Sequence, residues 1–282
     1  MEKIICEREI LEKRKKEFKK AGIEKLAIFS DFERTLTKAK VKGKNVLSFS
    51  GILRESPQYL GKEYCQKAKA LFEKYFPIEE NTQIPIYKRK KAMQKWWQSH
   101  FSLLVKYGLT KKILKKIAKS KKIKLRRGVK KFFLFLRKHQ IPLILISASG
   151  LGKETLEFFL KKEKLFFPNV QIISNEYLWD DNEKAIKIKS PILHSLNKDE
   201  INFKNFPHIY EKIKNRKNVI LLGDMIEDVK MIKNFDYENV IKIGFLNERV
   251  SEKIKKYKKA FDCLILNDGS FLFVNKLLKE VI

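Results

Sequence analysis

Cysteine is scarce in this chain of 282 residues, which has only Cys6, Cys65 and Cys263 and no Cys-x-x-Cys pair. The sequence therefore predicts neither a disulfide framework nor a zinc site, as is typical of a protein in the reducing cytosol. Long apolar runs are also lacking, and none approaches the roughly 20 residues that a membrane-spanning helix requires. The charged N-terminal segment lacks the apolar stretch of a secretory signal. These absences together predict a soluble, cytoplasmic protein.

Acidic residues are in short supply, because 33 aspartates and glutamates face 63 lysines and arginines, for a formal net charge of +30. Such a charge attracts anions, whether nucleotides, nucleic acid or acidic lipid. A compositional bias is the other interpretation, since the excess lysines are spread along the chain. The sequence contains no basic cluster interleaved with aromatics, no RNA-recognition signature and no zinc-finger spacing. Nucleic acid is therefore not the expected partner.

Short apolar runs without polar alternation predict strands that are buried on both faces of a parallel sheet. Helical patterns separate the later runs, at residues 153–164, 206–215 and 227–234. Strands that alternate with helices predict an α/β fold with a doubly wound parallel sheet. The predicted strands are residues 25–31, 141–147, 169–174, 218–224, 240–245 and 262–268.

The stretch between Asp31 and Ile141 interrupts this alternation, because it holds helical patterns but no convincing parallel strand. We therefore predict a helical cap, residues 46–123, inserted after the first strand of a catalytic core formed by residues 1–45 and 124–282. After this insert, the helix predicted over residues 126–140 would lead the chain back into the sheet. The helices predicted before it are residues 2–20, 62–76, 87–108 and 110–120.

Polar residues follow several of the predicted strands at their carboxyl ends, which is where open α/β sheets bind ligands. Asp31 and Glu33 follow the first strand, and Asp224 and then Asp228 follow the fourth. Lys198 comes from a loop before a helix. The second strand supplies a hydroxyl and small residues, Ser147, Ala148 and Ser149. Acids, a hydroxyl and a lysine at one sheet edge are typical of phosphoryl transfer through an aspartyl-phosphate.

Elementary chemistry assigns roles to these residues. Asp31 would attack phosphorus, and a cation is needed because a carboxylate and a phosphate dianion repel each other; Mg²⁺ prefers such oxygen ligands. Glu33 lies two residues on and would act as general acid and then as base. Lys198 would pair with Asp31 and the transferring group. The predicted phosphate-binding residues are Ser147, Ala148, Ser149 and Lys198. The predicted metal ligands are Asp31, Glu33, Asp224 and Asp228.

Four segments, SDFERTLT, ISASGLG, LNKDE and LLGDMIEDVKM, resemble in order the motifs of the haloacid dehalogenase superfamily. Further segments, among them WWQSHFSLLV and FPNVQIISNEYLWDDN, resemble the pyrimidine 5′-nucleotidase family, also called cytosolic 5′-nucleotidase III. The likeness covers nearly the whole chain, from about Ile23 to Ile282. It implies a haloacid dehalogenase-like Rossmannoid core and a helical cap that closes over base and sugar. The implied activity is Mg²⁺-dependent release of phosphate from nucleoside 5′-monophosphates, with pyrimidines as the expected bases.

The chain departs from this family pattern at three places. Glu33 stands where the family has the second aspartate of Asp-x-Asp, and its side chain is one methylene longer. The loop after Ser147 has one residue more than the usual Ser-Ala-Gly, with Lys153 where an acid is usual. A cap glutamate that helps to read the base in the family would fall at Lys95, or at Gln94 if a gap is placed.

Aromatic residues at the centre of the cap leave two readings open. Trp96 and Trp97 are each either interior packing residues or stacking partners of a nucleobase. His100, one turn further on, is either a satisfied interior histidine or a functional residue. We include Gln94, Lys95, Trp96 and His100 in the predicted substrate site.

Three functions compete at this point. The leading one is a nucleotide phosphohydrolase, a phosphoric monoester hydrolase of the 5′-nucleotidase class. The second is a phosphotransferase that passes the phosphoryl group to a nucleoside. The third is a degenerate family member that binds nucleotide or RNA without turnover, which Glu33 and the charge of +30 motivate. The full set of Asp31, Lys198, Asp224 and Asp228 argues against a mere binder. A monomer is expected.

Overall fold

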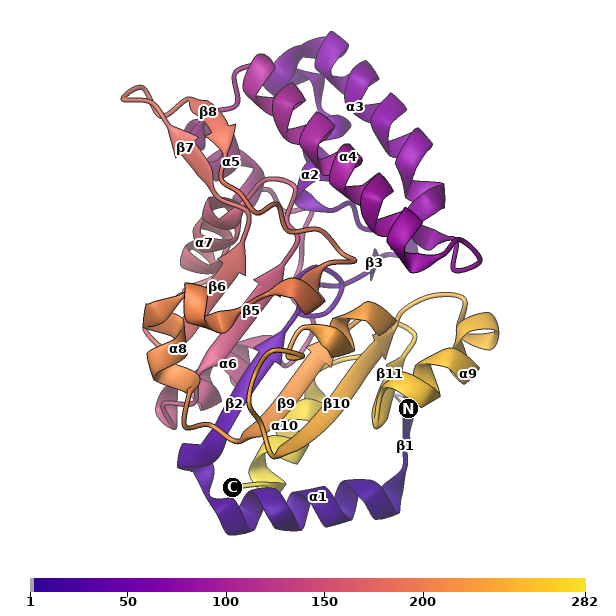
Figure 1. Cartoon of the computed structure of the whole chain (residues 1–282), viewed down its shortest axis with the longest axis vertical. Helices are drawn as coiled ribbons and strands as arrows, with labels where there is room; N and C mark the ends of the chain where they lie inside the picture. Colours follow the sequence, from indigo (N-terminus) through magenta and orange to yellow (C-terminus); the bar gives the residue numbers. More distant parts are fainter. Residues whose placement is uncertain (1–2) are drawn as a thin grey trace.

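A parallel sheet forms the centre of the computed structural model, which describes residues 3–282 (Figure 1). All the strands predicted from apolar runs are confirmed, each with its ends shifted by at most a few residues. They were recognisable because strands covered on both faces have nearly continuous apolar runs. These strands are β2 (Leu26–Ser30), β5 (Leu143–Ser147), β6 (Val170–Ser174), β9 (Asn218–Gly223), β10 (Asn239–Leu246) and β11 (Cys263–Leu266).

The strand order is β1-β11-β10-β9-β2-β5-β6, and every neighbouring pair is parallel except β1 with β11. The chain leaves β2 toward β5 and β6 on one side and later returns to β9, β10 and β11 on the other. The order therefore reverses beside β2, which makes the carboxyl end of that strand the expected ligand site of a doubly wound sheet.

Two apolar layers cover the sheet, one on each face. Ile28 and Leu222 belong to one layer, whereas Ala27, Phe29 and Leu221 belong to the other. Alternate residues of each strand thus enter different layers, as the pleat of a strand requires. The helices of the core are α1 (Arg8–Ala21), α6 (Val129–Lys138), α7 (Lys153–Lys162), α8 (Pro207–Ile213), α9 (Val250–Ala260) and α10 (Leu272–Glu280).

The N-terminal segment differs from the prediction. The helix expected over residues 2–20 begins only at Arg8, because Ile4–Cys6 form the edge strand β1, which pairs antiparallel with β11. Glu2 lies outside the described residues. The register places Cys6 directly opposite Cys263, and a disulfide joins them with a Cα–Cα distance of 4.2 Å. The expectation of no disulfide was therefore wrong, since two cysteines this far apart in sequence give no spacing signal.

Helices α2 (Phe49–Arg54), α3 (Pro57–Glu80), α4 (Ile86–Lys106) and α5 (Lys111–Ala118) occupy the stretch between β2 and α6. Figure 1 shows α3 and α4 side by side above the carboxyl end of the sheet, beyond the hairpin of β3 (Lys40–Val41) and β4 (Lys44–Asn45). A second hairpin, β7 (Tyr177–Trp179) and β8 (Ala185–Ile188), contacts α4.

Short 3₁₀ helices complete the described part of the chain. The α-helix predicted over residues 227–234 is instead the 3₁₀ helix η4, where the Asp228 side chain accepts from the backbone N–H of Met225 at the N-terminus. Within residues 3–282, every helix is too short or too polar to cross a membrane. The 3₁₀ helices are η1 (Ile23–Lys25), η2 (Lys198–Glu200), η3 (Phe203–Asn205) and η4 (Ile226–Lys230).

Candidate active site

Three aspartates converge at the carboxyl ends of β2 and β9. Asp31 directly follows β2, and its backbone N–H donates to Leu222 O at 3.0 Å, which fixes it against β9. One carboxylate oxygen each from Asp31, Asp224 and Asp228 lies within 4.8 Å of the others. The structure thus brings together three of the four predicted metal ligands. Asp31 and Asp228 are buried, with 7% and 1% of their surfaces exposed.

Lys198 neutralises part of this cluster. Its Nζ donates to Asp31 at 2.6 Å and to Asp228 at 2.7 Å. Burial alone would lower the pKa of Lys198, but Asp228 and Asp31 outweigh burial and raise it, so the lysine stays charged. Lys198 was assigned to the site only from its position in a sequence motif, and the structure shows that it lies between Asp31 and Asp228. A charge this deeply buried is tolerable only with such partners.

The three aspartates fit a divalent cation because Lys198, with Arg34 at 3.5 Å from Asp224, offsets only part of the charge of three carboxylates. Burial, followed by Asp31 and Asp228, raises the pKa of Asp224 well above its ordinary value. Burial also raises the pKa of Asp31 to about 6, although Lys198 opposes that shift. Carboxylates that lie close together repel each other when ionised, and a nearby cation favours their ionised form. Oxygen-only ligands are the set that Mg²⁺ prefers.

Asp228 also shapes the turn after β9. Its Oδ2 accepts from the backbone N–H groups of Asp224 at 3.1 Å and Met225 at 2.9 Å. A Cβ atom at Gly223 would lie 2.5 Å from the Asp228 Cβ, so only glycine fits there. The Gly223-Asp224 sequence is therefore needed for Asp228 to reach the cluster.

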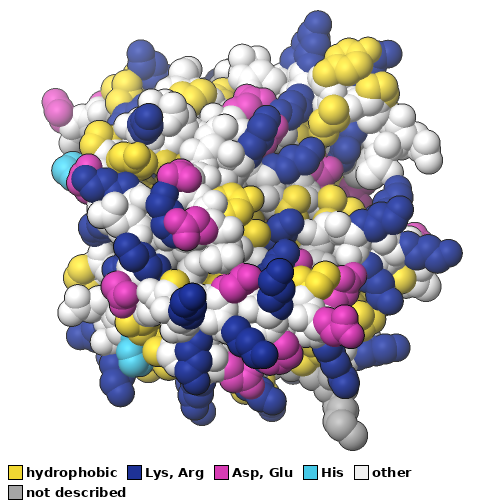
Figure 2. Space-filling model, turned by 60° about the horizontal axis from the view of Figure 1, so that its bottom comes forward, with side chains coloured by type: hydrophobic (Ala, Val, Ile, Leu, Met, Phe, Trp, Pro, Cys, Tyr) yellow, Lys and Arg dark blue, Asp and Glu magenta, His cyan; other side chains and the backbone are white. Residues whose placement is uncertain are grey.

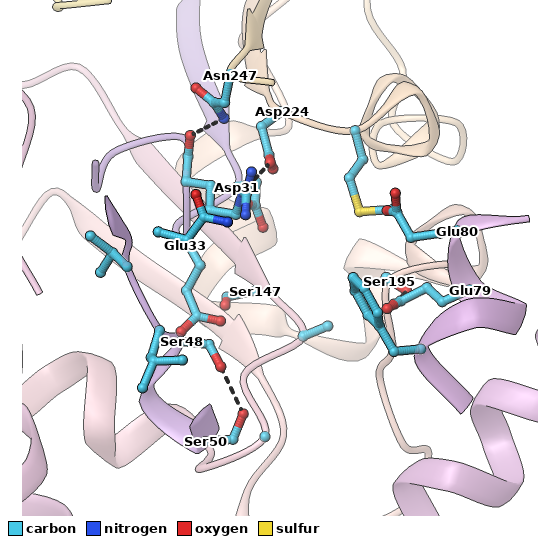
Figure 3. A pocket seen from close by; sticks show the side chains of 18 of the residues that line it. Asp31, Glu33, Ser48, Ser50, Glu79, Glu80, Ser147, Ser195, Asp224 and Asn247 are labelled. Carbon is cyan, nitrogen blue, oxygen red and sulfur yellow. Dashed lines mark hydrogen bonds and ion pairs between the residues drawn. The ribbon is translucent and has the colours of Figure 1, made fainter. Parts of the chain in front are cut away.

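Glu33 points away from the aspartates. Figure 3 shows its side chain extending toward Ser48 and Ser50 of the α2 region, and its Oε1 accepts from Phe49 N–H at 2.8 Å. Burial raises the pKa of Glu33 to about 7, despite the Phe49 hydrogen bond that opposes the shift. Within residues 3–282, the structure does not bring Glu33 into the aspartate cluster. Its carboxyl group is placed to exchange protons near neutral pH.

The loop after β5 lies beside Asp31. Ser147 and Ala148 line the same cavity as the aspartates. Ser149 is fully buried, and its Oγ accepts from Leu151 N–H at 3.3 Å, so that hydroxyl is engaged within the loop. A phosphate at this loop would meet the Ser147 hydroxyl and backbone N–H groups.

Helices α2, α3 and α4, which lie in the predicted cap, help to line a cavity of about 840 Å³ beside these residues, and Trp96, Trp97 and His100 are among the lining residues. Among residues 3–282, the lining does not include Gln94 or Lys95. Both were predicted to contact substrate, but the helical period turns positions 94 and 95 away when Trp96 and His100 face inward. The Trp96 and Trp97 rings are stacked with centroids 5.3 Å apart.

Sequence reasoning missed several lining residues, most of all Glu79 and Glu80 at the end of α3. Both acids lie across the cavity from Asp31 in Figure 3. Ser195 Oγ donates to Glu79, and burial raises the pKa of this carboxyl to about 6 despite that bond. Two adjacent acids in so basic a chain were the available signal. Arg34 was also missed; it approaches Asp224 at 3.5 Å and Glu248 at 3.0 Å.

The fold is that of haloacid dehalogenase-like proteins. A HAD family hydrolase from Salmonella enterica shares the fold, with a TM-score of 0.53 and 14% identity over 90% of this chain and 71% of its own. A crystal structure of cytosolic 5′-nucleotidase IIIB bound to cytidine superposes with a TM-score of 0.84 and 26% identity. It covers 99% of this chain and 92% of the other.

Sequence comparison then gives the family. The sequence model of the pyrimidine 5′-nucleotidase (UMPH-1) family matches residues 34–282. The 7-methylguanosine phosphate-specific 5′-nucleotidase A of Xenopus laevis is 32% identical over 93% of this chain and 89% of its own length. The human 7-methylguanosine phosphate-specific 5′-nucleotidase is 31% identical over 94% of this chain and 87% of its own length. The chain belongs to the pyrimidine 5′-nucleotidase family and is a 5′-nucleotidase, a phosphoric monoester hydrolase.

Proposed function

We propose that this protein hydrolyses nucleoside 5′-monophosphates in a Mg²⁺-dependent reaction with a phosphorylated Asp31. The observation that carries the proposal is the position of the Asp31 carboxylate, 2.6 Å from Lys198 Nζ and within 4.8 Å of Asp224 and Asp228 oxygens. Asp31, Asp224 and Asp228 would hold the ion. When bound, it would offset the charge of the phosphate and of the attacking carboxylate.

The reaction would proceed in two displacements. A carboxylate oxygen of Asp31 attacks phosphorus and the bond from phosphorus to the nucleoside O5′ breaks. Glu33, which lines the same cavity as Asp31, would turn from Phe49 N–H toward O5′ and give it a proton. Glu33 then takes a proton from water, whose oxygen attacks phosphorus while the bond from phosphorus to the Asp31 oxygen breaks. Inorganic phosphate leaves and the Asp31 carboxylate is restored. Lys198, Ser147 and the loop N–H groups hold the phosphoryl oxygens throughout.

The cap, residues 46–123, would select the base. Phe72 and Trp96 offer apolar ring surface in the cavity, and Glu79 offers a carboxylate that accepts hydrogen bonds from base amino groups. An acid among aromatic rings also suits a base that carries positive charge. We therefore propose that 7-methylguanosine monophosphate is a substrate beside pyrimidine nucleotides. The names of the Xenopus and human relatives support the former, and the cytidine in the matched structure supports the latter.

The test is phosphate release from CMP, UMP, 7-methyl-GMP, AMP and GMP with Mg²⁺, beside the same assays with a metal chelator. Asp31→Asn keeps the shape but removes the nucleophile, so it should lower the rate by at least about 10³-fold. No release above that of Asp31→Asn from any nucleotide would refute the proposal. We also propose that the protein acts in the cytoplasm, as the name of the matched cytosolic enzyme suggests.

A further inference from the structure

A histidine of the cap holds the loop that follows β5. His100 projects from α4, and its Nε2 lies 2.8 Å from the carbonyl oxygen of Gly150. Only 6% of its surface is exposed. Tyr177 Oη donates to the same carbonyl at 3.4 Å. Helix α4 is thus hydrogen-bonded to the backbone of Gly150, 50 residues further along the chain than His100. Gly150 lies in the loop that contains Ser147.

Gly150 is a glycine because the cap approaches it so closely. A Cβ atom there would lie 2.9 Å from His100 Nε2 and 3.1 Å from the Cβ of Ser50, which belongs to α2. Both distances are shorter than ordinary contacts with a real Cβ. Two cap helices therefore close on the bare backbone of this residue, and any side chain at position 150 would force them apart.

The proton arrangement at this contact follows from chemistry. A carbonyl oxygen can only accept, so His100 Nε2 must carry the hydrogen. Burial lowers the pKa of His100 to about 4, which keeps the ring neutral around pH 7. Ring contacts with Trp97 and Phe101, at centroid distances of 5.3 and 5.4 Å, hold the imidazole in place. His100 is therefore a fixed hydrogen-bond donor.

The contact falls on Gly150, the third residue after Ser147 at the end of β5. Inside the loop, Ser149 O accepts from Asn175 at 3.4 Å and Ser149 Oγ from Leu151 N–H. The Gly150 carbonyl, in contrast, accepts from outside the loop, from His100 at 2.8 Å and from Tyr177 of β7 at 3.4 Å.

We propose that His100 is a positioning residue that couples the cap to the phosphate loop, so that the loop takes its anion-binding form when α4 is docked. This inference rests on the proposed function in one respect, because it takes Ser147 and its neighbours as the phosphate-binding loop. His100 acts through Gly150 and need not touch the substrate.

The first test compares His100→Phe, which keeps an aromatic ring but loses the donor, with His100→Gln, whose amide nitrogen can reach the place of Nε2. The Phe variant should lower kcat/KM between about 10- and 100-fold and weaken inhibition by inorganic phosphate. Inhibition by the nucleoside product should stay unchanged. The Gln variant should recover most of the loss. Equal losses in both variants, or equal weakening toward phosphate and nucleoside, would overturn the proposal.

A double substitution tests the contact itself. Gly150→Ala should impair phosphate inhibition strongly in the wild-type background but less in the His100→Ala background, where the space occupied by Nε2 is free. Additive effects of the two changes would contradict direct coupling. Melting temperatures of all variants show whether the fold is intact.

Hydrogen exchange separates this proposal from the proposed function. In the free protein, backbone amides of residues 147–152 should exchange faster in His100→Phe than in the wild type. That result with an inactive wild type would refute the nucleotidase proposal and keep the coupling. Unchanged exchange in an active enzyme would refute the coupling alone.

Discussion

Glu33 has one methylene more than the aspartate of the family motif, and the structure shows what the extra length reaches. Its carboxylate accepts from Phe49 N–H at the start of α2, at 2.8 Å. The shorter side chain of a Glu33→Asp variant would withdraw from this partner. We therefore expect Glu33→Asp to lower kcat by about tenfold, since misplacing a proton donor by about an ångström is costly.

Steady-state kinetics on a nucleoside monophosphate check this expectation. Glu33→Gln serves as the reference for complete loss of the acid and should lower kcat between about 10²- and 10⁴-fold. A Glu33→Asp enzyme faster than the wild type would mean that Glu33 is a compromised acid. The interpretation that the site has adapted to the longer side chain would then be wrong.

Glu79 has a raised pKa and therefore links stability to pH. Its folded-state pKa of about 6 lies above the ordinary 4.5, mainly through burial. The native state then binds the proton more tightly than the unfolded chain, so the stabilising contribution is present below about pH 4.5 and is lost as the pH rises through about 6. At neutral pH the ionised carboxylate opposes folding.

Glu79→Gln should accordingly raise the melting temperature at pH 7.5, on the order of 2–4 °C, and leave it nearly unchanged near pH 4.5. Thermal unfolding at both pH values measures this difference. Glu73→Gln, at an exposed acid of the same helix, is the matched control and should show neither effect. A lower melting temperature for Glu79→Gln at pH 7.5 would contradict the assigned shift.

The three aspartates of the site were predictable, whereas the cap was predicted only in part: Trp96 and His100 line the cavity as expected, and Gln94 and Lys95 do not. Asp31, Asp224 and Asp228 follow buried parallel strands, and the carboxyl ends of such strands must meet at one edge. Cap residues obey no comparable rule. Glu79 could not be placed in the cavity without knowing how α3 lies over the sheet. The direction of the Glu33 side chain could not be predicted from the local sequence either, because it depends on the position of α2.

The cap helices are held to the core by ion pairs. Lys90 of α4 lies 2.7 Å from Asp199 and 2.6 Å from Glu200, both in η2 beside Lys198. Glu80 of α3 pairs with Arg249 and, at 3.3 Å, with Lys253. These contacts join elements that must separate if the cap opens. They should therefore favour the docked cap, and salt should weaken them.

Lys90→Met should loosen the cap while its methylenes are retained. We expect KM to rise severalfold with little change in kcat, because substrate binding must then also order the cap. Lys91→Met, at an exposed lysine one position along, is the control and should behave like the wild type. The difference between the two variants should shrink at high salt. Equal KM values in both would exclude a role for this ion pair.

The strands were easier to predict than the elements at the ends of the chain. Strands such as β5 and β9 are buried at every position and contain continuous apolar runs, which no amphipathic surface helix imitates. Strand β1 has three residues in a charged segment, and only its pairing with β11 defines it. The sequence pattern of residues 227–234 predicted an α-helix rather than η4. A local pattern does not show that Asp228 caps η4 and also contacts Lys198.

The formal net charge of +30 comes from lysines and arginines that are spread along the sequence. On the face shown in Figure 2, blue lysine and arginine side chains alternate with magenta acids and yellow apolar groups and do not merge into one basic area. The excess positive charge nonetheless creates a field around the protein that attracts small anions.

A nucleotide dianion should therefore be drawn toward the cavity over a long range. Screening shortens that range from about 10 Å at 0.1 M ionic strength to about 3 Å at 1 M. We expect kcat/KM to fall severalfold over this interval while kcat changes little, because only the encounter depends on the distant charges.

Two lysine variants separate this attraction from a general effect of salt. Lys38 lines the cavity, whereas Lys13 lies on α1 at the opposite end of the molecule (Figure 1). Lys38→Gln should flatten the salt dependence of kcat/KM more than Lys13→Gln does, since the field at the entrance depends most on the nearest charges. The dependence should persist in Lys90→Met, which removes the contribution of the Lys90 ion pairs. Identical slopes for Lys38→Gln and Lys13→Gln would show that salt acts on the enzyme rather than on the approach of its substrate.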